Sequence, residues 1–426
     1  MRAGRSRDGG GIAFAVVIVL VALNLRAFLT SSSPLLEPIR LATGIGFHAV
    51  ALLTVLPMFA MGATSLFGAS VGQRIGARGG IALGLAAIAL ACASRYVAGG
   101  AAALLWSAAL AGAGVGLVQA LMPGVVKQAY PLRIGVMTGL YSAAIMGGGG
   151  LGAMASPWVA HAVGSDRVDW HAGLAMWSVL AMLALLSWLM VMRQTNAEPA
   201  AQRQSLSWLR CFASRRAWLL AVCFGLINGG YTSLVAWLPH FYEQQGWTAQ
   251  QAGSVLALMT AAQVIAALAM PAIARSRGRD LRPWLMLTLV AQLAGFCALL
   301  FGLPVPAVAI AVVLGFGLGG AFALCMVLAL DHLPDPAQAG ALAGFMQGVG
   351  FMIAALAPFV TGWVREHTGG FTMAWAYLAA VVVVLLPLML RFDPRRYAAA
   401  TAGLFGAHDT PRQPPSLTAL DSARKV

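Results

Sequence analysis

The stretch IAFAVVIVLVALNLRAFLTSSS, residues 12–33, decides the fold class of this chain. It holds about 20 residues that are almost all apolar, enough for one helix to cross roughly 30 Å of hydrocarbon. One arginine, Arg26, lies inside it. A charge at that depth costs about 2.5–3.5 kcal/mol on insertion scales, so a membrane helix keeps such an arginine only for a functional or structural reason.

The rest of the chain has the same character. Of its 426 residues, 60% are hydrophobic and only 9% are charged, a composition that would cover a soluble domain of this size with one apolar patch. We therefore predict an all-α integral membrane protein with twelve transmembrane helices. The predicted spans are residues 12–33, 47–70, 80–98, 101–125, 134–160, 171–192, 216–240, 250–273, 283–303, 305–330, 338–363 and 371–391.

The net charge of +14 follows the topology of a membrane protein. If the N-terminus is cytoplasmic, most Lys and Arg residues fall in cytoplasmic segments, and only Arg40, Arg95, Arg167 and Arg365 fall outside. This is the positive-inside distribution, and it argues against nucleic acid as a partner. The excess of Arg over Lys and the many Ala and Gly residues are typical of a GC-rich bacterial genome. We expect a multi-pass protein of a bacterial inner membrane with both termini cytoplasmic.

The chain divides into two similar halves. We predict a cytoplasmic tail (1–11), a six-helix bundle (12–193), a cytoplasmic linker (194–215), a second six-helix bundle (216–391) and a cytoplasmic tail (392–426), with irregular structure at 1–11 and 397–426. At an offset of about 205 residues, Arg26 aligns with Tyr231; at 203, the glycines 112, 114 and 116 align with 315, 317 and 319. Repeated halves indicate a transporter with its site between two rocking bundles. Chance alignment of glycine-rich helices is the alternative.

Arg26 begins a polar stripe that continues through Thr30, Ser33 and Glu37 on one helix face. Arg26 could be structural, bonding a carbonyl of a neighbouring helix or extending toward the membrane surface. We favour a functional role, because an arginine fork in a low dielectric anchors a small anion or carboxylate well.

Other polar residues inside the spans could complete a binding site. These are Asn24, Gln119, Tyr141, Asn228, Tyr231, Gln263 and Gln347, with Thr138, Thr232 and Gln292 as further hydroxyl and amide groups. Each is also consistent with hydrogen bonding between helices. Lys127 lies at the cytoplasmic rim, where a topology charge is the simpler interpretation.

No carboxylate is clearly mid-membrane, so Glu37 and Asp331 are the acidic candidates for coupling. The sequence has no phosphate-binding loop, no zinc-protease motif and no catalytic triad pattern, so we expect neither ATP hydrolysis nor another enzyme activity. The five cysteines lack metal or disulfide spacing, and we expect no cofactor.

Residues 69–78, Ala-Ser-Val-Gly-Gln-Arg-Ile-Gly-Ala-Arg, resemble the loop Gly-x-x-x-Asp-Arg-x-Gly-Arg of the major facilitator superfamily. Arg74, Gly76 and Arg78 match and are gating candidates, whereas Gln73 replaces the acid. Closer resemblance is to the cyanate and nitroimidazole transporter family (CynX/NimT type). It rests on Leu23–Arg26, Thr54–Pro57, Met122–Lys127 with Pro131, Met137–Tyr141 and Leu328–Pro334.

This resemblance implies a secondary carrier for a small anionic or heterocyclic compound, and Arg26 is our first candidate to bind it. We expect a monomer in membrane lipid, with co-transport of a proton left open. A drug or metabolite exporter with an apolar pocket is the first alternative, and a membrane sensor is a distant one.

Overall fold

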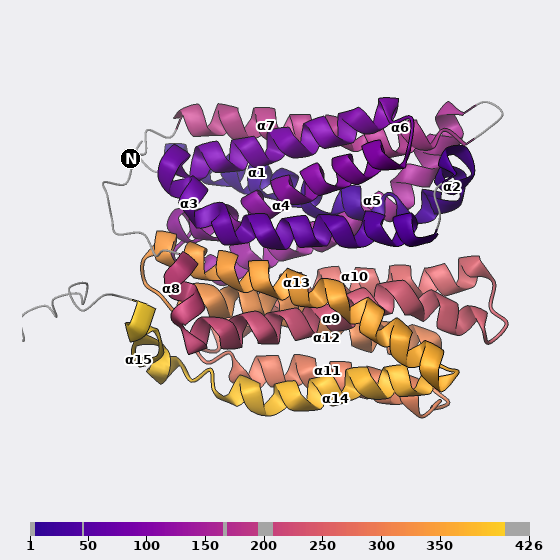
Figure 1. Ribbon diagram of the computed structural model, residues 1–426. Helices are drawn as coiled ribbons and strands as arrows, with labels where there is room; N and C mark the ends of the chain where they lie inside the picture. Colours follow the sequence, from indigo (N-terminus) through magenta and orange to yellow (C-terminus); the bar gives the residue numbers. More distant parts are fainter. Residues whose placement is uncertain (1–4, 45–46, 165–167, 195–207, 405–426) are drawn as a thin grey trace, which may run out of the picture.

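The computed structural model describes the backbone of residues 5–44, 47–164, 168–194 and 208–404 (Figure 1). Nearly all of these residues are helical, and no strand occurs among them. The long helices are α1 (Arg5–Thr30), α3 (Phe47–Ser94), α4 (Ala101–Ala129), α5 (Ile134–Val163), α7 (Trp177–Gln194), α9 (Arg215–Glu243), α10 (Ala249–Ser276), α11 (Arg282–Leu300), α12 (Ala307–Asp331), α13 (Pro336–Thr368) and α14 (Thr372–Leu390). The short ones are η1 (Ser33–Leu35), α2 (Leu36–Thr43), η2 (Arg95–Val97), α6 (Trp170–Ala175), α8 (Trp208–Ala213), η3 (Pro394–Arg396), α15 (Tyr397–Thr401) and η4 (Ala402–Leu404).

Eleven helices in the described ranges are long and apolar enough to cross a membrane. One of them, α3, holds two of the predicted spans, 47–70 and 80–98, so the chain makes twelve crossings. The two parts of α3 meet at Gly76, whose backbone has φ 77° and ψ 155°. Only glycine adopts such angles without strain, and the chain reverses direction there. The prediction of an all-α membrane fold is confirmed.

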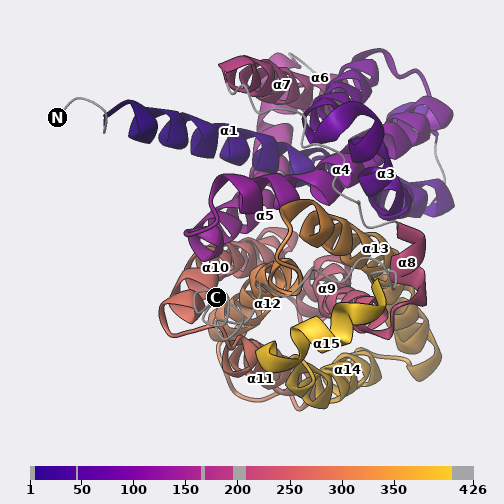
Figure 2. The ribbon, with the colours of Figure 1, turned by 90° about the vertical axis from the view of Figure 1, so that its left-hand side faces the viewer.

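The helices form two bundles that lie side by side (Figure 1). Helices α1–α7 make the N-terminal half and α9–α14 the C-terminal half. The start of α1, α8 and α15 lie at one end of the molecule, which we call the α8 end; the opposite end carries α2 (Figure 1). The segments expected to be irregular are partly helical, because residues 5–11 belong to α1 (Figure 2) and residues 397–404 form α15 and η4.

The aligned glycines occupy equivalent places in the two bundles. A Cβ atom on Gly112 or Gly116 of α4 would overlap backbone of Pro57 or Met61 in α3. In the second half, a Cβ on Gly315 or Gly319 of α12 would overlap backbone of Met259 or Gln263 in α10. These partners are 202 residues apart along the chain, within one residue of the 203-residue offset of the glycines, so the glycines are where equivalent helix backbones touch.

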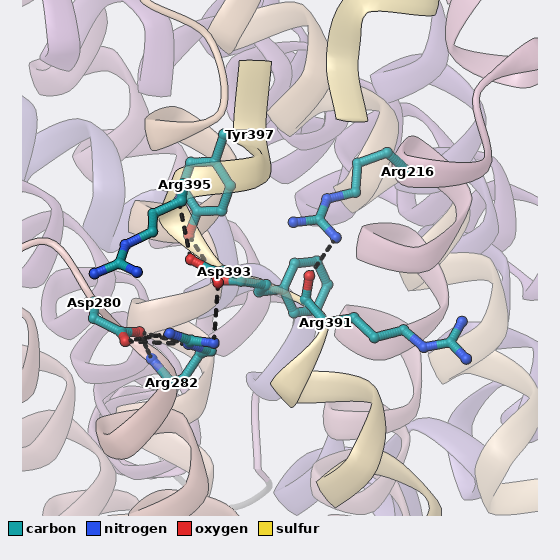
Figure 3. Close-up of polar contacts among 8 residues, drawn as sticks. Arg216, Asp280, Arg282, Arg391, Asp393, Arg395 and Tyr397 are labelled. Atoms are coloured by element: carbon teal, nitrogen blue, oxygen red, sulfur yellow. Dashed lines mark hydrogen bonds and ion pairs between the residues drawn. The ribbon is translucent and has the colours of Figure 1, made fainter. Parts of the chain in front are cut away.

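A polar cluster closes the C-terminal half at its α8 end (Figure 3). Arg282 pairs with Asp280 at 2.7 Å and lies 3.6 Å from Asp393. Hydrogen bonding to Arg282 holds the pKa of Asp280 below its ordinary value. Arg216 donates to the carbonyl oxygen of Arg391 (2.8 Å). The cluster fixes the segment after α14 to the first turns of α9 and α11.

In addition to Arg26, two other arginines are buried. Arg95, predicted outside the membrane core, is 4% exposed within the N-terminal half, and Arg216 is 9% exposed. Arg95 follows α3 directly, and its long side chain turns back into the bundle toward Ser107 of α4. The sequence predicts Arg95 on the outer side of the membrane, but it does not predict that its side chain is buried in the bundle.

Candidate functional site

Arg26 lies in the last turns of α1 and reaches across to the other half of the molecule. Its guanidinium carbon is 4.8 Å from the ring centroid of Tyr231 in α9 and 5.4 Å from that of Phe322 in α12. The side chain is 6% exposed. Each cation–π contact contributes about 2 kcal/mol when desolvated, so the two together are comparable to the cost of burying the charge.

Within the described part of the chain, no acidic side chain pairs with Arg26, and no residue accepts a hydrogen bond from its guanidinium. The rings of Tyr231 and Phe322 contact the guanidinium of Arg26. A ring face accepts no full hydrogen bond, so the N–H donors of Arg26 have no partner among the described residues. An arginine in this state can bind an anion through two parallel hydrogen bonds.

Thr30 of the predicted polar stripe, and Asn24 two residues before Arg26, hydrogen-bond to backbone within the N-terminal half. Thr30 donates to the carbonyl oxygen of Gly149 in α5 (2.7 Å), which joins α1 to α5. Asn24 donates to Leu20 in its own helix (2.7 Å) and faces Leu180 of α7 (3.5 Å). The side chains of Ser33 and Glu37 lie outside the described residues. Only Arg26 of this stripe is seen in contact with the C-terminal half.

Gln119 of α4 and Gln347 of α13 meet where the two halves join. The Gln347 amide nitrogen donates to the backbone oxygen of Gln119 (2.9 Å). Both residues are fully buried. Neither polar atom of the Gln119 side chain has a hydrogen-bond partner among the described residues, and neither has the side-chain oxygen of Gln347.

Other buried polar atoms also lack a hydrogen-bond partner among the described residues. The hydroxyls of Thr138, Tyr141 and Ser142 in α5 and the side-chain oxygen of Gln263 in α10 lack partners in the described part of the chain. Buried polar groups are almost always hydrogen-bonded. Within the described ranges, unpaired atoms also occur on Arg216, Tyr242, Arg275 and Trp375. Those on α4, α5, α10 and α13 are candidates to bond water or a ligand.

The remaining predicted amides and hydroxyls are used for packing. Asn228 donates to Phe224 within α9 (2.8 Å), Thr232 to Ala354 of α13 (2.8 Å) and Gln292 to Gly317 of α12 (3.1 Å). Asn228 is nevertheless on the same helix as Tyr231, less than one turn away.

Lys127 makes a contact between the halves that sequence analysis missed. Its ammonium group donates to the carbonyl oxygens of Leu330, in the last turn of α12, and of Leu333, two residues after the helix ends. The last carbonyls of a helix carry partial negative charge, so a cation is favoured there. Next to them, Asp331 pairs with Arg275 of α10.

The halves are also tightly packed by backbone at this end. A Cβ on Gly124 of α4 would come within 2.9 Å of the carbonyl oxygen of Pro336 in α13, and one on Gly139 of α5 within 2.8 Å of that of Leu268 in α10. Lys127 and these glycines together close the α8 end. The positive-inside rule already accounts for Lys127, which lies two residues after the predicted span 101–125. The sequence therefore carries no signal of a partner 203 residues away.

The predicted gating segment lies at the turn between the two parts of α3. Arg74 and Gln73 are exposed. Arg78 is half-buried, and its carbonyl oxygen accepts a bond from the Trp188 indole (3.1 Å).

Comparison with known proteins gives this geometry a family context. Residues 13–355 match the model of the Major Facilitator Superfamily. The chain is 46% identical over 383 residues to the cyanate transport protein CynX of Escherichia coli (strain K12), covering 90% of this chain and 97% of the relative. It is 28% identical over 386 residues to the 2-nitroimidazole transporter of the same organism, covering 88% and 93%.

Solved structures agree with the fold. The proton:xylose symporter XylE superposes with a TM-score of 0.73 at 14% identity, covering 90% of this chain and 96% of that one. A human organic anion transporter superposes with a TM-score of 0.72 at 17% identity, covering 89% and 99%.

Proposed function

The chain belongs to the major facilitator superfamily of secondary transporters, and we propose that it carries a small monovalent anion of the cyanate type, bound by Arg26. The observation that carries this proposal is the state of Arg26. It is a buried guanidinium between the two halves, close to the rings of Tyr231 and Phe322, and its N–H groups are unpaired among the described residues.

The charge of the substrate follows from the charge of the site. A buried cation is costly unless an opposite charge is present, and a monovalent anion would supply that charge with every transport cycle. The unpaired amides and hydroxyls of Gln119, Tyr141, Gln263 and Gln347 are neutral. They can donate to or accept from the uncharged end of a small polar molecule without a second charge.

The relatives support this class of substrate. One is named for cyanate, a linear anion small enough for a guanidinium fork, and another for 2-nitroimidazole, a flat heterocycle. A heterocycle could stack against Tyr231 while its nitro group accepts from Arg26. Both substrates would use the same residues.

Alternating access would proceed by rocking of the two bundles around Arg26. We place the α8 end in the cytoplasm of a bacterial cell, with both termini inside, because most Lys and Arg residues outside the spans lie there. The contacts of Lys127 with Leu330 and Leu333 would then close the cytoplasmic side, and must break when that side opens. Asp331, beside these contacts, is the described carboxylate best placed to couple a proton. We expect a monomer in lipid.

Uptake by reconstituted protein tests the proposal. Proteoliposomes should accumulate radiolabelled cyanate saturably, unlabelled cyanate should compete, and Arg26→Ala should abolish uptake although it still inserts and folds. Wild-type rates in folded Arg26→Ala protein would disprove the site. Drug sensitivity on deletion of the protein, without anion uptake, would support the exporter instead.

A further inference from the structure

Arg95 is a second buried arginine without an acidic partner among the described residues, and it lies apart from the contacts of Arg26 with Tyr231 and Phe322. It lies at the end of α3 inside the N-terminal bundle and is 4% exposed. Its Nε donates to Oγ of Ser107 (3.1 Å), and one Nη donates to the carbonyl oxygen of Phe28 (3.2 Å). These bonds use two of its five N–H groups. No described carboxylate pairs with it.

A small cavity adjoins this guanidinium. Besides Arg95, its walls are the apolar side chains of Phe28, Ile39, Leu53 and Leu174 and their neighbours, with the hydroxyl-bearing Ser32. Its size admits about one water molecule or one monatomic ion. A tetrahedral oxyanion is too large for it.

The cavity holds a full positive charge in apolar surroundings. Burial of an ion without a partner is costly, and neutral hydrogen-bond acceptors reduce that cost only in part. A water molecule would accept from the free N–H groups but leave the charge in place. An anion would accept the same bonds and neutralise the charge, and charge-assisted bonds are about twice as strong as neutral ones.

We propose that this cavity binds one small monovalent inorganic anion, of which chloride is the test case, as the counter-ion of Arg95. Because Arg95 holds the carbonyl of Phe28, two residues after Arg26, the bound ion would fix the end of α1 that presents Arg26 to the C-terminal half. The site is separate from the proposed transport site and does not depend on it.

Thermal unfolding of the purified full-length protein in detergent tests this site. Sodium chloride is exchanged for sodium gluconate at constant ionic strength, so that only the anion changes. We expect the apparent Tm to rise by a few degrees with chloride and, above the Kd, to grow with the logarithm of the chloride concentration c, because a ligand of the folded state stabilises it by RT ln(1 + c/Kd). Bromide should act like chloride and should give an anomalous diffraction peak beside Arg95.

Variants identify which arginine binds the ion. Arg95→Gln should lose the chloride-dependent shift, and Arg26→Gln should keep it. If Arg95→Gln does not fold, Leu104→Phe fills the cavity while leaving Arg95 in place, and it too should lose the shift. A wild-type protein whose Tm does not rise when chloride replaces gluconate would overturn the proposal. So would an effect that disappears in Arg26→Gln but persists in Leu104→Phe, which would place the ion at the transport site.

Discussion

The guanidinium of Arg26 lies over the ring of Tyr231, 4.8 Å from its centroid, and the two residues come from opposite halves of the molecule. They also align with one another when the halves are superimposed in sequence. The pair therefore lies near the pseudo-symmetry axis, where a site can stay in place while the halves rock around it.

Substitution of Tyr231 tests what the ring contributes. Tyr231→Phe keeps the cation–π contact and should transport at near wild-type rates, whereas Tyr231→Leu removes about 2 kcal/mol of desolvated cation–π energy and should reduce uptake roughly tenfold or more. The matched control is Tyr377→Leu, a half-buried tyrosine on α14. If Tyr231→Phe transports as poorly as Tyr231→Leu, the hydroxyl rather than the ring face is the functional group.

The substitution Arg26→Lys tests whether the substrate is held by two parallel hydrogen bonds from the guanidinium. Lysine keeps the charge but cannot donate two parallel in-plane bonds, and each charge-assisted hydrogen bond contributes about 1.5–3 kcal/mol. We expect uptake to fall at least tenfold, with most of the loss in apparent substrate affinity. Arg396→Lys, at an exposed position, is the control. Full activity of Arg26→Lys would mean that the substrate responds to charge alone.

The fold and part of the site were predictable from the sequence. Apolar runs of about 20 residues reveal spans because the bilayer permits little else, and the aligned glycines mark equivalent backbone contacts. The offset of the halves paired Arg26 with Tyr231. The contact of Phe322 with Arg26 could not be predicted, because an aromatic residue in a wholly apolar helix does not stand out from its neighbours as a site residue.

The partners of charged residues near the ends of the spans could not be predicted from the sequence. Topology rules account for any arginine or lysine there, so they conceal those with specific partners. Arg95 folds back into the bundle, and Lys127 reaches the carbonyls of α12. The contact of Gln347 with the backbone of Gln119 depends on how the two halves dock, which residue patterns within either half do not encode.

Lys127→Met should weaken closure at the α8 end. It removes charge-assisted bonds to Leu330 and Leu333 that contribute about 1.5–3 kcal/mol each, so the ratio of closed to open forms should fall roughly tenfold or more. Spin labels on the exposed positions Leu132 and Arg277, in a cysteine-free background, would report this as a longer distance component. Lys127→Arg should preserve the wild-type distribution, as should Arg133→Met. An unchanged distribution in Lys127→Met would show that the glycine contacts alone close this end.

His332, which directly follows α12, should make the stability of the folded protein depend on pH. It is 3% exposed and stacks on Tyr397 with 4.0 Å between ring centroids. Its Nδ1–H donates to the carbonyl oxygen of Leu328 (2.6 Å), and its Nε2 accepts from Arg216 (3.0 Å), so the neutral ring is required. Burial, with a smaller contribution from Arg216, lowers the pKa of His332 to about 4.

The unfolded chain binds a proton at this histidine below a pKa of about 6.5, whereas the folded protein resists protonation until about pH 4. The stabilisation is therefore complete above pH 6.5 and is lost as the pH falls toward 4. Between pH 7.5 and pH 5 the loss should be on the order of 2 kcal/mol. Thermal unfolding across this range should show the decline in wild-type protein, and His332→Gln, which has one donor and one acceptor but no titration, should remove much of it. His240→Gln, at an exposed position, should leave the decline intact; an equal decline in His332→Gln would assign it to another group.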